Sequence, residues 1–226
     1  MRNELLDKKW RKLLGRIWLF RFIPFLDFVL VAGSLATGNV SENSDFDVIV
    51  GARQGRIFTV RGLSWFLLGI PRWRRGGLTH KNEAKDKICL NHFVTSKSYK
   101  LKPPYNAYWG ELYRNLVPVF GEIEKVNEFF RANDWLKPKR EYLARDSRHS
   151  SKGKFGIVKF FESGLFDWFW NFFENLQRRI QLKLIKSSVK ADLGYKPRIV
   201  YNDNELEFHP DTKRIEAMLA MERRKK

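Results

Sequence analysis

Cysteine is nearly absent from this chain, and its scarcity excludes two kinds of structure. Cys89 is the single cysteine among 226 residues. One thiol cannot form a disulfide within the chain, and it cannot build a zinc site from cysteines. The sequence therefore favours a reducing, cytoplasmic environment. Because Cys89 lies in the apolar run Ile88-Cys89-Leu90, we predict that it is buried for structural reasons.

Long apolar runs are also missing. Residues 10–31 are rich in large apolar side chains, but charged residues and Pro24 interrupt them. No run reaches the roughly 18–20 apolar residues that are needed to span a bilayer. Asp27 lies inside the apolar stretch before Ala32, which argues against a signal peptide cleaved there. We predict neither a transmembrane segment nor cleavage.

Acidic residues are few relative to basic ones. The chain has 25 Asp and Glu against 43 Lys and Arg, which gives a formal net charge of +18. An excess of this size favours a polyanionic partner: nucleic acid, nucleotide phosphates or an anionic membrane face. The charge alone does not choose among the three.

The first hundred residues alternate between helical and strand patterns. We predict helices over 4–22, 35–37 and 56–70, and strands over 25–31, 46–50 and 87–95. A basic loop, with Arg72, Arg74, Arg75, Lys81 and Lys85, precedes the last strand. The pattern predicts an α/β (α+β) domain over 1–102, a small mixed sheet flanked by helices. The basic loop is either solvated or folded over a triphosphate.

After Pro103 and Pro104 the pattern becomes mainly helical. We predict a helix over 106–132 that breaks at 118–121, a basic linker near 137–154, and a strong helix over 157–186. Short strands over 198–201 and 206–208 and a helix from 211 complete the mainly helical C-terminal region, 103–226.

The predicted helix 157–186 is apolar on nearly all sides up to Phe173. A helix of this kind is either well buried or presents a surface to a partner or a membrane. Its aromatic side chains either pack in the core or stack on bases. Basic residues such as Arg179 and Lys183 either follow a nucleic-acid backbone or face solvent.

Two short motifs carry chemistry. Gly33-Ser34 follows the first strand, and Ser44-Asp45-Phe46-Asp47 leads into the second. Aspartates two residues apart near one strand project to the same side, where their oxygens suit Mg²⁺ or Mn²⁺. A Gly-Ser turn supplies a close approach, a hydroxyl and backbone N–H groups for phosphates. We predict metal ligands at Asp45 and Asp47, and nucleotide-binding residues at Gly33, Ser34 and Ser44.

This order of strand, Gly-Ser turn, short helix, paired aspartates and strand resembles the DNA polymerase beta-like nucleotidyltransferase superfamily, over residues 25–95. The chain is also similar to uncharacterised bacterial nucleotidyltransferase-domain proteins, through the strand Ile88-Cys89-Leu90-Asn91 and through Phe208-His209-Pro210. The resemblance implies that a nucleoside triphosphate donates its nucleoside monophosphate to an acceptor. It also implies a third acidic metal ligand on a later strand.

Asn91 stands where that third ligand is expected, so the predicted catalytic set is Asp45, Asp47 and Asn91. Asparagine can offer a carbonyl oxygen to a metal but cannot take a proton. Asp86 is expected to lie too far away, and strand alternation turns His92 to the face opposite Asn91. Two functions stay open: an active metal-dependent nucleotidyltransferase, or a catalytically impaired module that binds nucleotide or RNA. Peripheral membrane contact is a third alternative.

Overall fold

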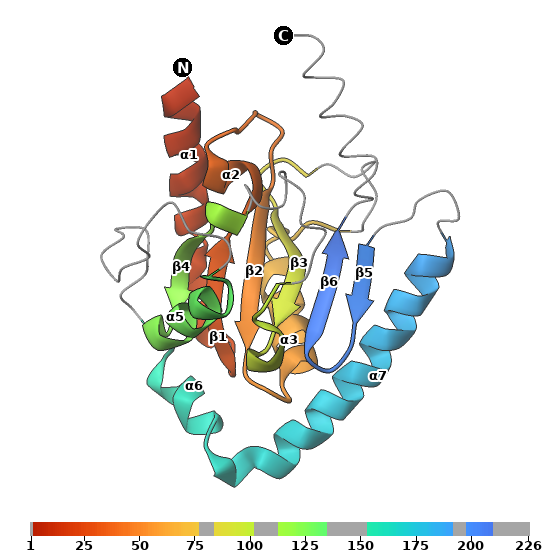
Figure 1. The fold of residues 1–226 in the computed structure, drawn as a ribbon. Helices are drawn as coiled ribbons and strands as arrows, with labels where there is room; N and C mark the ends of the chain where they lie inside the picture. The colour runs from red at the N-terminus through yellow and green to blue at the C-terminus, as the bar shows by residue number, and fades with distance from the viewer. Residues whose placement is uncertain (1, 77–83, 102–112, 135–152, 192–197, 210–226) are drawn as a thin grey trace.

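The computed structural model describes residues 2–76, 84–101, 113–134, 153–191 and 198–209 (Figure 1). The elements of the first half are α1 (Arg2–Leu14), η1 (Ile17–Phe22), β1 (Leu26–Val31), α2 (Gly33–Thr37), β2 (Phe46–Ala52), α3 (Ile57–Gly69), β3 (Ile88–Val94) and η2 (Ser96–Ser98). Those of the second half are β4 (Val117–Gly121), α5 (Ile123–Ala132), α6 (Gly156–Phe161), η4 (Gly164–Phe166), α7 (Asp167–Ala191), β5 (Arg198–Tyr201) and β6 (Glu205–His209).

The six strands form one mixed sheet in the order β4-β1-β2-β3-β6-β5. β1 pairs antiparallel with both β2 and β4, and β6 pairs antiparallel with both β3 and β5. β2 and β3 are parallel, and α3 lies in the connection between them. The predicted α/β class, a mixed sheet flanked by helices, is confirmed.

Each face of the sheet is covered by a hydrophobic core, and side chains of the central strands alternate between the two cores. Val48 and Val50 point into the larger core, which also takes in side chains of α1, η1, α3 and α7. Ile49 points into the smaller core, to which α5 contributes Val126 and Phe129. Coverage on both faces explains why the central strands are apolar at nearly every position.

The segment 117–121 corrects one prediction. It is the strand β4 and not a break within a helix, and α5 begins only at Ile123. Val117 and Val119 are β-branched and fit a strand. Pro118 is tolerated because β4 is an edge strand of the sheet. Proline has no N–H to donate, and an edge strand has a neighbouring strand on one side alone. The break predicted at 118–121 is therefore a strand that the prediction missed, and the predicted helix continues as α5, while residues 106–112 lie outside the described residues.

Two other predicted helices are divided. The helix predicted over 4–22 is α1 followed by the 3-10 helix η1, with Gly15 between them. The helix predicted over 157–186 is a bent unit of α6, η4 and α7, here called the amphipathic hairpin. The Trp170 indole N–H donates to the Phe161 carbonyl, 2.6 Å away, and so ties α7 to α6 across the bend.

Strands from both predicted regions share the sheet. β4 extends it beside β1, and β6 extends it beside β3, although β4 and β6 come after residue 102. Most of the predicted linker, 137–152, and the helix predicted from 211 lie outside the described residues. Among the residues that are described, no helix is long and apolar enough to cross a membrane.

Candidate metal and nucleotide site

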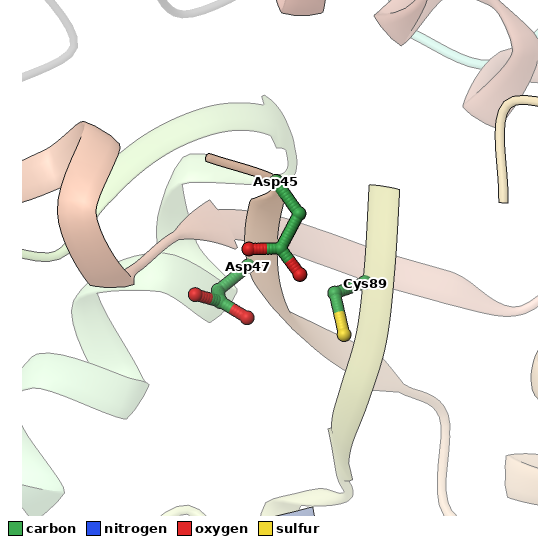
Figure 2. Close-up of side chains that lie close together, drawn as sticks. All are labelled: Asp45, Asp47 and Cys89. Atoms are coloured by element: carbon green, nitrogen blue, oxygen red, sulfur yellow. The ribbon is translucent and has the colours of Figure 1, made fainter. Parts of the chain in front are cut away.

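Asp45 and Asp47 lie together at the beginning of β2. Figure 2 shows their carboxylates close to each other, with the side chain of Cys89 facing them from β3. One ligand atom from each of these three residues lies within 4.8 Å of the other two. The spacing of the two aspartates thus brings their oxygens together, as the sequence predicts.

The register of the sheet explains the place of Cys89. In the parallel pair β2–β3, Asp47 lies opposite Cys89. Ile88 and Leu90, the neighbours of Cys89 in β3, point into the larger core, so Cys89 turns to the side of Asp47. Cys89 is buried, as predicted, but it is buried against the paired carboxylates.

Gly33 packs directly against Asp47. Its φ is +66°, and a Cβ at this position would lie 2.3 Å from Asp47 Oδ2. A side chain therefore has neither the backbone conformation nor the space that it would need. The neighbouring Ala32 N–H donates to the Asp47 carbonyl at 2.9 Å. The close approach that the sequence predicts for this glycine is made to the carboxylate itself.

The two predicted nucleotide-binding serines differ in their surroundings. Ser34 is half-buried in α2, directly after Gly33. The Ser44 hydroxyl accepts from the Ser41 N–H at 2.9 Å and lies 3.1 Å from the Ser41 hydroxyl. Ser44 therefore shapes the loop that leads to Asp45.

Lys9 of α1 holds this loop in place. Its ammonium donates to the carbonyls of Glu42 and Ser44, at 2.8 and 2.9 Å. Asp86 lies 2.9 Å from the same nitrogen and also pairs with Lys12. Asp86 therefore pairs with two lysines of α1. The role of Lys9 could not be predicted, since its partners are far away in the sequence.

Arg75 brings a positive charge to the site. Its guanidinium donates to Asp45 Oδ2 at 2.6 Å. The backbone fixes its position, because the Arg75 N–H donates to the Ile88 carbonyl at 2.9 Å, beside the beginning of β3. Of the other bases predicted in this loop, Arg74 lies over the ring of Trp65 and Lys81 falls outside the described residues.

Asn91 contacts the site as a donor. Its side-chain N–H donates to Asp47 Oδ1 at 3.0 Å, and its carbonyl oxygen accepts from the Cys89 thiol. The amide oxygen that could have served a metal is thus already engaged. The Cys89 thiol lies within 4.8 Å of an oxygen of each aspartate, so it stands beside the pair together with Asn91.

Strict alternation, on which the prediction for His92 depended, fails at Asn91. A bulge lies here, since Val48 pairs with Leu90 while Ile49 pairs with His92. His92 turns to Glu205 of β6, and its Nε2 lies 3.1 Å from Oε1 of this buried carboxylate. With Glu207 these two residues form a second group that could hold a metal. The contact of His92 with Glu205 gives it a partner on β6.

Burial shapes the protonation of the site. Burial, followed by the nearby charge of Asp45, raises the pKa of Asp47 to about 7, while Arg75 and Asn91 act in the opposite direction. Burial and the two aspartates raise the pKa of the Cys89 thiol well above its ordinary value. Near neutral pH the thiol therefore stays protonated, and a cation beside the carboxylates would be stabilised.

Comparison with known proteins adds no relative. A scan of protein-family models found no match, and searches of curated proteins and of solved structures found none either. The resemblance to nucleotidyltransferases therefore depends on the residues of the two motifs and on their arrangement.

Proposed function

We propose that this chain is a metal-dependent nucleotidyltransferase of the DNA polymerase beta-like type. The convergence of the Asp45 and Asp47 carboxylates beside the Gly33 turn supports this proposal most strongly. Carboxylate oxygens are the ligands that Mg²⁺ and Mn²⁺ prefer. Desolvation of Asp47 and the charge of the neighbouring Asp45 raise the pKa of Asp47, and a divalent cation would offset both effects. The donor set therefore fits such an ion.

The neighbouring residues suit a nucleoside triphosphate. Asp45 and Asp47 would hold the cation, and Ser34 lies next to Gly33, which touches Asp47. Arg75 already binds Asp45, and a guanidinium pairs equally well with phosphate oxygens. The substrate would thus meet its cationic and hydroxyl contacts at the end of the sheet where the central strands β2 and β3 begin.

The transfer itself exchanges a phosphoanhydride bond for a phosphoester bond. The acceptor oxygen bonds to the α-phosphorus, the bond from this phosphorus to the pyrophosphate oxygen breaks, and the acceptor loses its proton. Neither Cys89, whose thiol pKa is raised, nor the Asn91 amide takes a proton near neutral pH. With Asp45 and Asp47 engaged on the cation, the proton would pass to water or to a substrate phosphate. A divalent cation, when bound, would neutralise charge on the phosphate oxygens.

The same two residues favour a second function, a module that binds nucleotide or RNA without turnover. The resemblance implies a third carboxylate, and the described residues provide only Cys89 and Asn91 beside the pair. The net charge of +18 suits RNA as the acceptor in the first case and as the ligand in the second. Product formation separates the two functions.

The test combines transfer with binding. The full chain is incubated with each α-labelled nucleoside triphosphate, Mg²⁺ or Mn²⁺, and RNA, protein or small-molecule acceptors, and labelled product and pyrophosphate are measured. Metal-dependent binding of a fluorescent nucleotide is followed in parallel. We expect Asp47→Asn to lower transfer by about a hundredfold or more, because one of the two charged ligands is lost.

Asp203→Asn is the control, because Asp203 is an exposed aspartate paired with Arg178 away from the site. It should leave transfer unchanged. Binding without product in the unmodified protein would establish the second function. If the protein shows no nucleotide binding and no product, both functions are contradicted. Transfer that survives Asp45→Asn and Asp47→Asn would contradict the assignment of the site.

A further inference from the structure

The amphipathic hairpin exposes an apolar surface that the candidate site does not use. Among the described residues, ten of the sixteen exposed large apolar side chains lie between positions 157 and 184. Leu165 and Trp168 are each 74% exposed, and Phe172 is 64% exposed. Single exposed apolar side chains are common on proteins, but a concentration on one element marks a contact surface.

The opposite side of α7 is fixed to the molecule. Trp170 and Ile185 are buried in the larger core. Between them Gln181 donates to the Phe58 carbonyl at 2.8 Å and accepts from Arg61 at 2.7 Å. With this side packed on α3, the exposed residues Trp168, Phe172, Leu176, Ile180 and Leu184 follow one another at four-residue steps. They form a stripe that faces outward.

Aromatic rings extend this surface around the bend of the hairpin. Phe160 and Phe166 meet with ring centroids 5.5 Å apart. At the beginning of α6, Phe155 meets Phe22 of η1 at 4.6 Å, and Phe22 meets Trp18 at 5.8 Å. Figure 1 shows α6 and α7 as a V at the end of the molecule away from the N-terminus, so its bend can approach a flat surface.

The charge that the hairpin presents outward is positive. Two of its acids are engaged with the rest of the molecule: Glu162 pairs with Arg53 and Lys154, and Glu174 accepts from the backbone of α3. A third, Asp167, is exposed and lies 3.5 Å from Arg56. The exposed bases include Lys159, Arg179, Lys183 and Lys186. Lysine and arginine can lie along an apolar surface and still reach out with their charged ends.

We propose that the amphipathic hairpin binds the surface of an anionic lipid membrane. The aromatic bend enters the boundary between headgroups and acyl chains, and the bases of α7 meet the lipid phosphates. Charge selects this occupant, because a second copy of the chain would bring the same positive surface. RNA binds mainly through basic side chains and needs few apolar contacts, so the many exposed apolar side chains favour lipid. The inference is independent of nucleotidyl transfer.

Vesicle flotation with the full chain tests this proposal. The probes are vesicles of phosphatidylcholine alone and of phosphatidylcholine with phosphatidylglycerol, each at low and at high salt. We expect binding to the anionic vesicles that weakens with salt. Trp168→Ser with Phe172→Ser should reduce it about tenfold or more. Replacing Arg179, Lys183 and Lys186 by Gln should weaken it by about fivefold for each cation removed.

Leu176→Ser and Ile123→Ser are the matched pair, since both side chains are 41% exposed and only Leu176 belongs to the hairpin. Leu176→Ser should weaken vesicle binding, and Ile123→Ser should not. A protein that does not float with anionic vesicles would overturn the proposal. The proposal would also be overturned if the hairpin is required for dimerisation or for RNA binding while the protein does not bind vesicles. Asp47→Asn should float like the unmodified protein, which separates this result from the fate of the catalytic proposal.

Discussion

Cys89 occupies the place beside Asp47 where a third carboxylate would complete a metal site. We predict that Cys89→Asp raises the affinity for Mn²⁺ by about tenfold at about pH 8, because it adds a hard, charged ligand to the pair. Without metal the variant should melt below the unmodified protein, since it places a third carboxylate at a buried position beside two others, and like charges repel one another. Mn²⁺ should then restore much of the lost stability.

Titration calorimetry and thermal melts with and without Mn²⁺ measure both effects. Cys89→Ser is the control, because it keeps the size of the side chain and adds no charge. Equal Mn²⁺ affinities of the aspartate and serine variants would show that position 89 does not share an ion with Asp45 and Asp47.

Asp27 gives the protein a pH dependence of its own. It is buried in β1, and burial raises its pKa from 3.8 to about 6 against the lowering effect of Lys154 and Arg53. Folding therefore favours the protonated form. Ionisation of this carboxylate in the folded protein therefore lowers the free energy of unfolding. The loss is absent below about pH 4, grows between the two pKa values, and reaches about 3 kcal/mol above the folded-state pKa.

We predict that Asp27→Asn is more stable than the unmodified protein at about pH 8, by up to about 3 kcal/mol, and equally stable at about pH 4. Tyr99, whose hydroxyl lies 3.4 Å from the carboxylate, can donate to the amide oxygen instead. Urea denaturation at both pH values measures the difference, with exposed Asp203→Asn as the control. A difference that is the same at both pH values would contradict the role of ionisation.

At the residue scale, local spacing was sufficient to find part of the site. Asp45, Asp47 and Gly33 stand within fifteen positions of one another, and the structure places them in contact. Lys9 and Cys89 could not be assigned in the same way, because their positions depend on which strands and helices pair. Asn91 was assigned by the resemblance and the direction of His92 by alternation along β3, but the bulge at Asn91 is not visible in the sequence.

At the scale of elements, α3 depends on a residue of another helix for its cap. The side chain of the N-cap residue Arg56 makes no cap hydrogen bond to the first turn. Glu174 of α7 accepts from the N–H groups of Phe58 and Thr59, at 3.0 and 2.7 Å. An acceptor at this place satisfies groups that the helix itself leaves unpaired.

We predict that Glu174→Ala lowers the free energy of unfolding by about 1–2 kcal/mol, as the loss of a helix cap does. Glu174→Gln keeps one oxygen acceptor and should lose less. Glu128→Ala on α5 is the control, since Glu128 is partly exposed and pairs with Lys125 of its own helix. Urea denaturation measures all three, and equal effects of the two alanine variants would contradict the capping role.

Element types were predictable where an apolar segment lay between clear breaks, as in β1, β2, α3 and β3. β4 was missed because Pro118 and a short apolar segment read as a helix break. Its identity as a strand comes from a partner, β1, that lies far away in the sequence. Residues 164–166 were likewise drawn into one long helix, although the chain bends there.

At the scale of the whole molecule, the first region depends on the second. β1 and β3 have partners, β4 and β6, that come after residue 102. Trp170, Ile185 and Phe208 fill the larger core beside residues of α3 and β3. A chain cut at residue 102 would therefore expose two strand edges and part of this core.

We predict that the fragment 1–102 shows no cooperative thermal transition and aggregates, whereas the full chain melts cooperatively. Calorimetry and light scattering on the two proteins check this. A cooperative melt of the fragment would instead show that residues 1–102 are a domain of their own.

The pairing of β3 with β6 has a consequence for synthesis on the ribosome. About 110 residues separate the end of β3 from the beginning of β6, and at about 5–20 residues per second they take about 6–20 s to make. Throughout this interval the outer edge of β3 has no partner strand within its own nascent chain. Neighbouring nascent chains on one messenger RNA carry the same edge, and strand edges pair with one another. The yield of folded protein should therefore depend on a chaperone that shields β3 and on the speed at which ribosomes read the segment between the two strands.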